Sequence, residues 1–167
     1  MTNRLELLLP VVVALVWPGF AHSQSKNTER ASMRHNVRIV FVCEHGAALS
    51  VVSAAYFNKI AREEHLELYA IARGTTPQKD VSVSAREGLK VDGVPFETKH
   101  PHALSGKDAA QARRIVAFCP IPPKYSRTAP VEIWDDVPVT GANYGLARDA
   151  ILRHLRELFR QLKSGDK

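Results

Sequence analysis

The eight residues from Cys43 to Ser50 form the segment with the clearest capacity for chemistry. They read Cys-Glu-His-Gly-Ala-Ala-Leu-Ser and connect an apolar, β-branched run to a stretch with helical spacing. A short loop that enters a helix directs several backbone N–H groups inward and adds the positive end of the helix dipole. We therefore expect this loop to bind an oxyanion. The same field favours the thiolate form of Cys43, which is the nucleophilic form of a cysteine.

The remaining side chains of the loop have distinct expected roles. Gly46 permits the left-handed backbone that a tight loop needs, and the two alanines keep bulky side chains away from the anion. Ser50 can donate a hydrogen bond to the sulfur of Cys43. His45 either tunes the thiolate or faces solvent, and solvent is favoured. The predicted oxyanion-binding residues are Glu44, His45, Gly46, Ala47, Ala48, Leu49 and Ser50.

Polar residues also follow two later strand-like runs. Cys119 directly follows one apolar run, and Asp135 and Asp136 follow another. In sheets of parallel strands, ligands bind beyond the carboxyl ends of the strands. Cys43, Cys119 and Asp135 are therefore expected at the same edge of one sheet.

The hydrophobic pattern of the chain alternates between the periods of strands and helices. Strands are predicted over 37–42, 66–72, 115–118 and 131–134. Helices are predicted over 50–64, 84–91, 105–113, with Ser105 as N-cap, and 144–162. This alternation predicts an α/β fold, a four-stranded parallel sheet with helices on both faces.

Composition limits the classes of partner. The chain has 167 residues, 45% hydrophobic and 24% charged, which suits one globular domain. The net charge is +6, but the basic residues are scattered and no aromatic-interleaved basic stripe is present. Nucleic acid is therefore disfavoured as a partner, and a small oxyanion or phosphorylated ligand is expected instead.

The N-terminus resembles an export signal. Arg4 precedes an 11-residue apolar run, and Ala21-His22-Ser23 supplies small residues at a cleavage site. This order is typical of a cleaved secretory signal. A membrane anchor is the alternative, but a span needs about 20 apolar residues. We predict a signal peptide over 1–23, a linker over 24–36 and a domain over 37–163, in a protein that is periplasmic or secreted without a stable membrane anchor.

The run VRIVFVCEHGAALS resembles the opening of the low-molecular-weight protein tyrosine phosphatase superfamily, which includes thiol-dependent arsenate reductases. That opening is an apolar strand, then Cys, five residues, Arg and Ser. Here Cys43 matches the nucleophile and Ser50 the serine. The later runs GVPFETKHPHAL, IVAFC, WDD and RDAILRHLREL follow in the family's order, so the resemblance covers residues 37–162.

The resemblance implies roles for the later polar residues. An aspartate after the fourth strand acts as general acid, and Asp136 is preferred to Asp135 for this role. Cys119 matches the second, attacking thiol of arsenate reductases, although no third cysteine follows it. In the absence of that role, Cys119 is a core residue. No cofactor is implied, and His100, His102 and Cys119 do not have metal-ligand spacing.

The chain departs from the family at Leu49, which occupies the position of the loop arginine. That arginine holds two oxygens of the transferring phosphoryl group in a planar fork. Loss of one transition-state donor costs about 10²–10³ in rate. Lys99, Lys107 or Lys124 could supply a replacement cation from another loop.

Three hypotheses follow. The domain binds a phosphate-like oxyanion with weak or absent turnover, which is favoured. Alternatively, it is an active cysteine-dependent phosphatase or an arsenate reductase using Cys43 and Cys119. The third is an interaction module stabilised by a Cys43–Cys119 disulfide, which an exported protein could form.

Overall fold

A four-stranded parallel sheet organises the protein. The structure, a computed structural model, describes residues 38–164, so the predicted signal peptide and linker lie outside the described residues. The strands lie in the order β2-β1-β3-β4, and every neighbouring pair is parallel. Their bounds are β1 Arg38–Cys43, β2 Tyr69–Gly74, β3 Ala112–Ala117 and β4 Val131–Ile133. The predicted fold class is confirmed.

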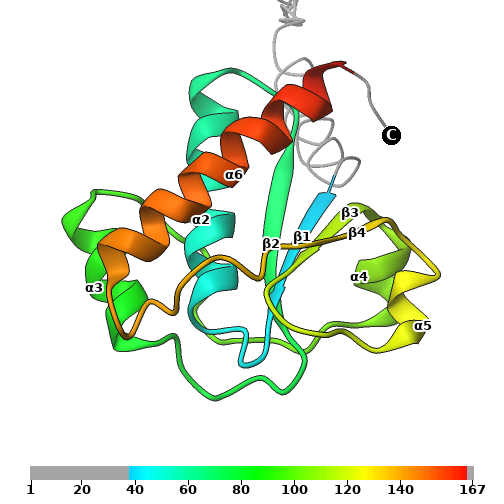
Figure 1. Cartoon of the computed structure of the whole chain (residues 1–167), viewed down its shortest axis with the longest axis horizontal. Coiled ribbons are helices and arrows are strands. Elements are labelled where there is room, and N and C mark those ends of the chain that lie inside the picture. Colours follow the sequence, from blue (N-terminus) through cyan, green and yellow to red (C-terminus); the bar gives the residue numbers. More distant parts are fainter. Residues whose placement is uncertain (1–37, 165–167) are drawn as a thin grey trace, which may run out of the picture.

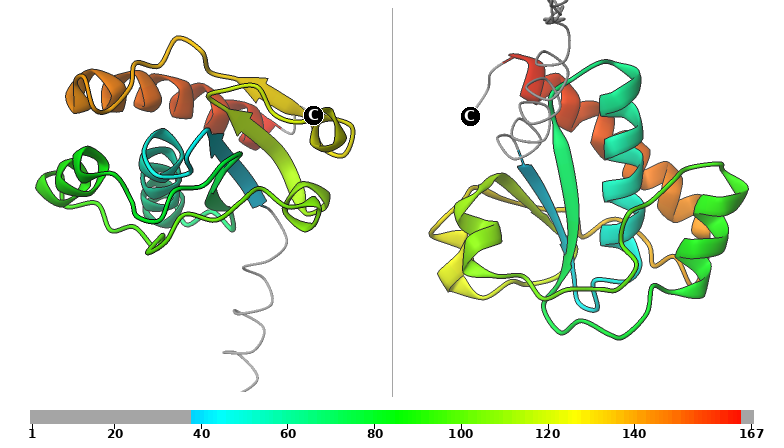
Figure 2. Two further views of the ribbon diagram at one scale, coloured as in Figure 1. Left: turned by 90° about the horizontal axis from the view of Figure 1, so that it is seen from below. Right: turned by 180° about the vertical axis from the view of Figure 1, so that it is seen from behind.

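Helices cover both faces of this sheet (Figures 1 and 2). Three of them pack on one face: α2 Leu49–Glu63, α3 Val83–Val91 and α6 Tyr144–Ser164. Two short helices lie on the other face: α4 Gly106–Ala110 and α5 Pro123–Ser126. None of the helices in the described part of the chain is long and apolar enough to cross a membrane.

Strand β1 is the centre of the core. Ile39 and Phe41 face the larger core beneath α2 and α6, whereas Val40 and Val42 face the smaller core beneath α4. All four side chains are fully buried, which explains the unbroken apolar run of this strand. Because β1 has a neighbour on each side, its last residue, Cys43, lies at the middle of the sheet edge.

Helix α2 is buried on almost every side. All of its residues from Leu49 to Asn58 are buried. Phe57 stacks on Phe159 of α6 with ring centroids 4.6 Å apart, so α2 packs against α6 as well as against the sheet. This burial fixes the start of the helix, where the loop from Cys43 ends.

Strands β2 and β3 and helix α4 depart most from their predicted boundaries. Strand β2 begins at Tyr69 rather than at position 66, because His65 adopts a left-handed conformation, φ 54°, and the Leu66 N–H still bonds Ala61. It also continues through Gly74, which pairs with Cys43.

The predicted helix over 105–113 was too long. It ends at Ala110 because the next residues pair with β1 as strand β3. The N-cap prediction is confirmed, since the Ser105 hydroxyl accepts from the Asp108 N–H in a complete capping box. Helix α5, within the proline-rich loop, was not predicted.

Candidate functional site

The loop from Cys43 to Ser50 closes around the cysteine sulfur. Cys43 is the last residue of β1, and Ser50 lies in the first turn of α2. The Cys43 Sγ and Ser50 Oγ atoms are 3.1 Å apart, and the Ser50 side chain is fully buried. The two ends of the loop therefore meet at the sulfur, and the predicted hydrogen bond is present.

The carbonyl groups of the loop are bonded outward. Four of them accept hydrogen bonds from backbone N–H groups of the segment 75–82, which follows β2. The bonds run from Thr75 to Cys43 (3.2 Å), Thr76 to Glu44 (2.8 Å), Gln78 to His45 (3.2 Å) and Ser82 to Ala47 (2.9 Å). In a planar trans peptide the N–H group points away from the C=O group. The N–H groups of Glu44, His45, Gly46 and Ala48 therefore point away from the segment 75–82.

These N–H groups have no acceptor in the described part of the protein. No N–H from Glu44 to Val51 donates to a backbone or side-chain acceptor there, and Val52 makes the first helical bond, to Ala48 at 3.0 Å. Helix α2 has no side-chain N-cap bond and no acidic residue in its first turn. Unpaired N–H groups at a helix N-terminus are the arrangement that binds anions.

Glycine is required twice at this site. Gly46 has φ 63°, which favours a residue without Cβ. A Cβ atom at Gly46 would also lie 2.8 Å from the backbone nitrogen of Gly74, and one at Gly74 would lie 2.7 Å from the nitrogen of Gly46. The loop and the end of β2 thus touch backbone to backbone.

Position 49 contributes an apolar side chain. Leu49 is 9% exposed and belongs to the core beneath α2. Within residues 38–164, no lysine or arginine forms a hydrogen bond or ion pair with the side chains of the loop. The Arg73 guanidinium, on β2, donates two hydrogen bonds of 3.0 Å to the Asp108 carboxylate.

The lysines considered as replacements have other surroundings. The ammonium group of Lys124 lies 4.9 Å from the centre of the Tyr125 ring. Lys99 lines a pocket beside β2, and Lys107 is an exposed residue of α4. His45 faces solvent, as favoured from the sequence, with its side chain 54% exposed and 3.9 Å from Glu44.

Cys119 lies close to Cys43. It follows β3, which neighbours β1, and the Phe118 N–H bonds the Val42 carbonyl at 2.8 Å. Burial raises the pKa of the Cys119 thiol, and the nearby Cys43 raises it further, while a hydrogen bond with Thr75 acts in the opposite direction. Both cysteines are free thiols in the structure, so the predicted neighbourhood is present without a disulfide.

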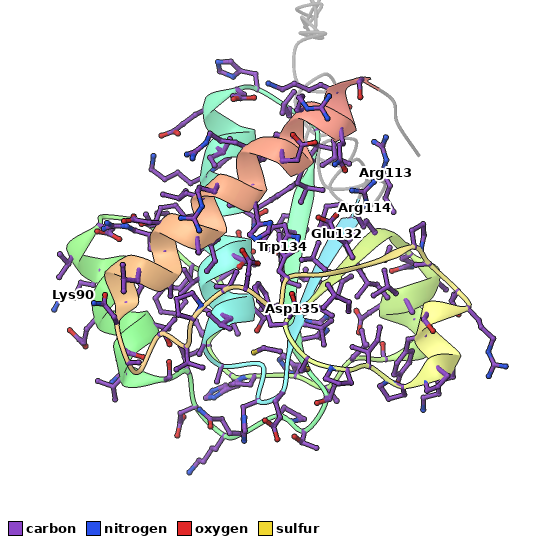
Figure 3. All side chains as sticks on the ribbon, viewed as in Figure 1. Lys90, Arg113, Arg114, Glu132, Trp134 and Asp135 are labelled. Atoms are coloured by element: carbon purple, nitrogen blue, oxygen red, sulfur yellow. The ribbon has the colours of Figure 1, made fainter. Side chains whose placement is uncertain are left out.

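The two aspartates after β4 differ in their contacts. Asp136, the preferred general acid, forms a hydrogen bond of 2.7 Å between its Oδ1 atom and His154 Nε2 of α6. The His154 ring stacks on Trp134 at 4.6 Å. Asp135, an exposed residue directly after Trp134 (Figure 3), forms no hydrogen bond or ion pair with any residue of 38–164. The free carboxylate is therefore that of Asp135.

The segment 75–82 is the part of the site that sequence analysis missed. Its role depends on backbone contacts with a loop some thirty residues earlier, which no residue type announces. The pair Gly74-Thr75 directly after a strand was the available signal, because glycine allows close approach of two backbones.

No group of three His, Cys, Asp or Glu side chains within 38–164 is arranged to hold a metal ion.

Comparisons with known proteins define the fold. A scan against protein-family models and a search of curated proteins each find no match for this sequence. Solved structures are similar, among them YfkJ of Bacillus subtilis, with a TM-score of 0.66 and 16% identity over 78% of this chain and 97% of that one. The low-molecular-weight protein tyrosine phosphatase of Streptococcus pyogenes has a TM-score of 0.62 and 12% identity over 75% and 92%.

Arsenate reductases share the same architecture. The thioredoxin-dependent arsenate reductase of Corynebacterium glutamicum has a TM-score of 0.58 and 14% identity over 85% of this chain and 74% of that one. An arsenate reductase in its phosphate-binding state has a TM-score of 0.62 and 13% identity over 74% and 97%. The chain therefore has the fold of low-molecular-weight tyrosine phosphatases and arsenate reductases.

Proposed function

We propose that this protein is an exported domain that binds a phosphate-like oxyanion at the Cys43–Ser50 loop, with weak or absent phosphatase activity. The observation that carries the proposal is the set of N–H groups from Glu44 to Val51 without a protein acceptor. Four carbonyl groups of the loop are already bonded to the segment 75–82, so the N–H groups need no rearrangement to meet an anion. Phosphate and arsenate present the tetrahedral oxygens that such donors recognise. An arsenate reductase of the same fold has been described in a phosphate-binding state.

Leu49 is the reason for expecting slow turnover. A phosphoryl group in transfer gathers negative charge on its oxygens, and a preorganised guanidinium fork is the usual group that neutralises it. The buried leucine supplies no such donor, and Arg73 is already paired with Asp108. The backbone N–H groups of the loop are present without the arginine, so anion binding would not require a charged side chain at position 49.

Export is part of the proposal and has its support in the sequence alone. A polar stretch separates the apolar run and the Ala21-His22-Ser23 site from the folded domain. A periplasmic or extracellular oxyanion would then be the ligand. This location would also expose the two thiols to oxidants.

The direct test of binding is an amide NMR titration of reduced protein with inorganic phosphate. We expect the amide signals of residues 44–51 to shift and saturate, because these donors would meet the phosphate oxygens. Chloride at equal ionic strength is the control for nonspecific effects. Shifts spread evenly over the surface, or none in the loop, would contradict the proposal.

A second candidate is an arsenate reductase, favoured by the proximity of Cys43 and Cys119. In this reaction the Cys43 thiolate would displace water from arsenate. The Cys119 thiolate would then attack the Cys43 sulfur, and arsenite would leave. The two thiols supply two electrons to As(V) and end as a disulfide, which an external thiol must reduce. Single-turnover production of arsenite by reduced protein, lost in a Cys119→Ser variant, would support this candidate.

A further inference from the structure

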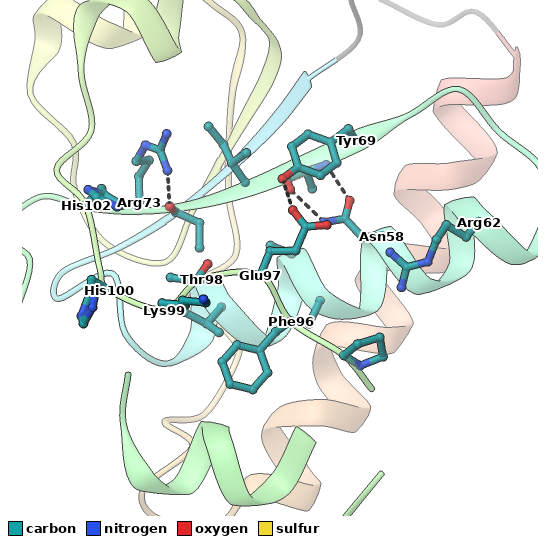
Figure 4. Close-up of a pocket in the computed structure, with 17 residues that line it drawn as sticks. Asn58, Arg62, Tyr69, Arg73, Phe96, Glu97, Thr98, Lys99, His100 and His102 are labelled. Atoms are coloured by element: carbon teal, nitrogen blue, oxygen red, sulfur yellow. Dashed lines mark hydrogen bonds between the residues drawn. The ribbon is translucent and has the colours of Figure 1, made fainter. Parts of the chain in front are cut away.

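A pocket of about 360 Å³ lies beside β2, apart from the Cys43 loop (Figure 4). Helix α2 and strand β2 form its floor, and the segment 95–102 runs across it. No residue from 43 to 50 lines it, and Val51 of α2 is the one residue with a proposed oxyanion donor that does. Its volume lies at the lower end of the range for small-molecule sites, so a compact ligand would fill it.

The outer edge of β2 is closed at both ends of the pocket. The Asn58 side chain bonds both the N–H and the C=O of Ala70, at 2.8 and 2.9 Å. Four residues later, the Gly74 N–H bonds the His102 carbonyl and the Gly74 carbonyl accepts from Leu104. Residues of a parallel strand alternate in the neighbour to which they present their polar groups.

Ala72, between these two points, must therefore face the same outer edge. Its carbonyl accepts from the Arg73 guanidinium at 2.9 Å. Its N–H is left without a partner on this edge among the described residues, and Ala72 itself is 2% exposed. Ala72 also lines the pocket, so a buried donor lies at the pocket wall.

Basic side chains dominate the charge of the pocket. Lys99, His100 and His102 lie at one end in Figure 4 and Arg62 at the other. His100 is 4.0 Å from Asp80, whereas Lys99 and His102 have no acidic partner within 38–164. The single acidic residue of the lining is Glu97.

Glu97 is engaged by a neighbour. Its carboxylate accepts a 2.7 Å hydrogen bond from the Tyr69 hydroxyl. Burial, together with this carboxylate, raises the pKa of Tyr69 to about 12, so the tyrosine stays a donor at neutral pH. The pocket therefore presents an excess of positive charge near the Ala72 N–H.

The floor of the pocket is lined by small apolar side chains, which leave it open. Ala54 and Ala55 of α2 and Ala70 of β2 leave the space that larger residues would fill, and Phe96 forms one wall. Ala54 and Ala55 are 6% and 3% exposed. A ligand lying there would remove its apolar surface from water.

We propose that this pocket binds a small carboxylic acid with a compact apolar body. The carboxylate would accept from the Ala72 N–H and pair with Lys99 and His102, while the apolar body lies over the alanines against Phe96. The site is separate from the Cys43 loop and does not depend on the function proposed for it.

The experiment is an amide NMR titration of the reduced protein with phenylacetate, with neutral phenylacetamide as the matched probe. We expect saturable shifts at Ala72 and along 95–102 with phenylacetate, and much weaker binding of phenylacetamide. Lys99→Gln should weaken phenylacetate binding about fivefold, the loss of about 1 kcal/mol of ion pairing. Lys107→Gln, which removes the same charge from α4 outside the pocket, should not change it.

Two further arms keep the result decisive. Ala54→Leu should fill the pocket and abolish binding; if this variant does not fold, the Lys99→Gln and Lys107→Gln pair decides. Saturating inorganic phosphate should leave the phenylacetate titration unchanged, which separates this site from the loop. Equal binding of the acid and the amide, equal effects of the two lysine variants, or phenylacetate shifts confined to residues 44–50 would each overturn the proposal.

Discussion

The contact between the Cys43 loop and β2 can be tested with two glycines of equal conformation. Gly46 has φ 63° and Gly93 has φ 64°. An alanine Cβ at Gly93 would have no atom within 4 Å, whereas one at Gly46 would lie 2.8 Å from the Gly74 nitrogen and 3.0 Å from its Cα. Both substitutions therefore pay the same backbone penalty, and only Gly46→Ala adds a clash with backbone.

The expected magnitudes follow from these two effects. The left-handed conformation costs an alanine about 1–2 kcal/mol, so Gly93→Ala should lower the free energy of unfolding by about that amount. Forcing extra volume into a packed region costs about 1–3 kcal/mol more. We therefore expect Gly46→Ala to lower the free energy of unfolding by about 2–5 kcal/mol, and always by more than Gly93→Ala.

Urea unfolding of both reduced variants, with and without phosphate, measures this difference. Phosphate at about 100 times its dissociation constant should stabilise wild type and Gly93→Ala by about 2.7 kcal/mol. Gly46→Ala should lose that gain, because the clash displaces the loop donors. Equal destabilisation by the two variants would refute the close approach. Undiminished phosphate stabilisation of Gly46→Ala would refute its link to the anion site.

Four further predictions concern catalysis, redox state, pH and export. Leu49→Arg should hydrolyse p-nitrophenyl phosphate at least about 10²-fold faster than wild type, and equal rates would mean that another cation acts. Protein purified without reductant should contain a Cys43–Cys119 disulfide; the separation of 119 − 43 = 76 residues gives about 4 kcal/mol of stabilisation, less any strain, and two titratable thiols per denatured chain would contradict it. Burial alone would raise the pKa of Asp108, but hydrogen bonds from Arg73 and Ser105 hold this pKa below its ordinary 3.8. The unfolded chain therefore binds the proton at higher pH than the folded protein, and the free energy of unfolding should fall as the pH drops below about 4. Asp108→Asn should reduce this loss of stability at low pH in unfolding experiments. Intact-mass measurement of exported protein should give an N-terminus near Gln24, and full-length chain in a membrane fraction would contradict it.

Sequence patterns predicted the sheet because burial controls them. Strand β1 is buried on both faces and reads as a continuous apolar run, and α6 buries Ala150, Leu155, Leu158 and Phe159 at helical spacing. Where burial is partial, the pattern was weaker. Ala112 is half-buried and Arg113 is exposed, and both fell within the predicted helix over 105–113, yet both belong to β3, where the pairing with β1 shifts register.

The candidate site was predictable only in part. Cys43 lies beside Ser50 and near Cys119 because β1 and its neighbour β3 end at the same edge of the sheet, where α2 begins. The ties between the segment 75–82 and the loop carbonyls are backbone contacts, which carry no residue signature. The preference for Asp136 over Asp135 rested on resemblance. No sequence pattern indicated that His154, eighteen residues later, forms a hydrogen bond with the Asp136 carboxylate.

The shape of the loop and the identity of residue 49 are physically independent. The loop is held by four carbonyl bonds to the segment 75–82, by the contact between Gly46 and Gly74, and by the bond between Cys43 and Ser50. None of these involves the side chain at position 49, which packs in the core instead. Replacement of an arginine there removes the charged fork while leaving every backbone donor in place. The anion site proposed for this protein would therefore survive without an arginine at position 49, whereas phosphoryl transfer would lose its charged donor, so binding and turnover must be measured separately.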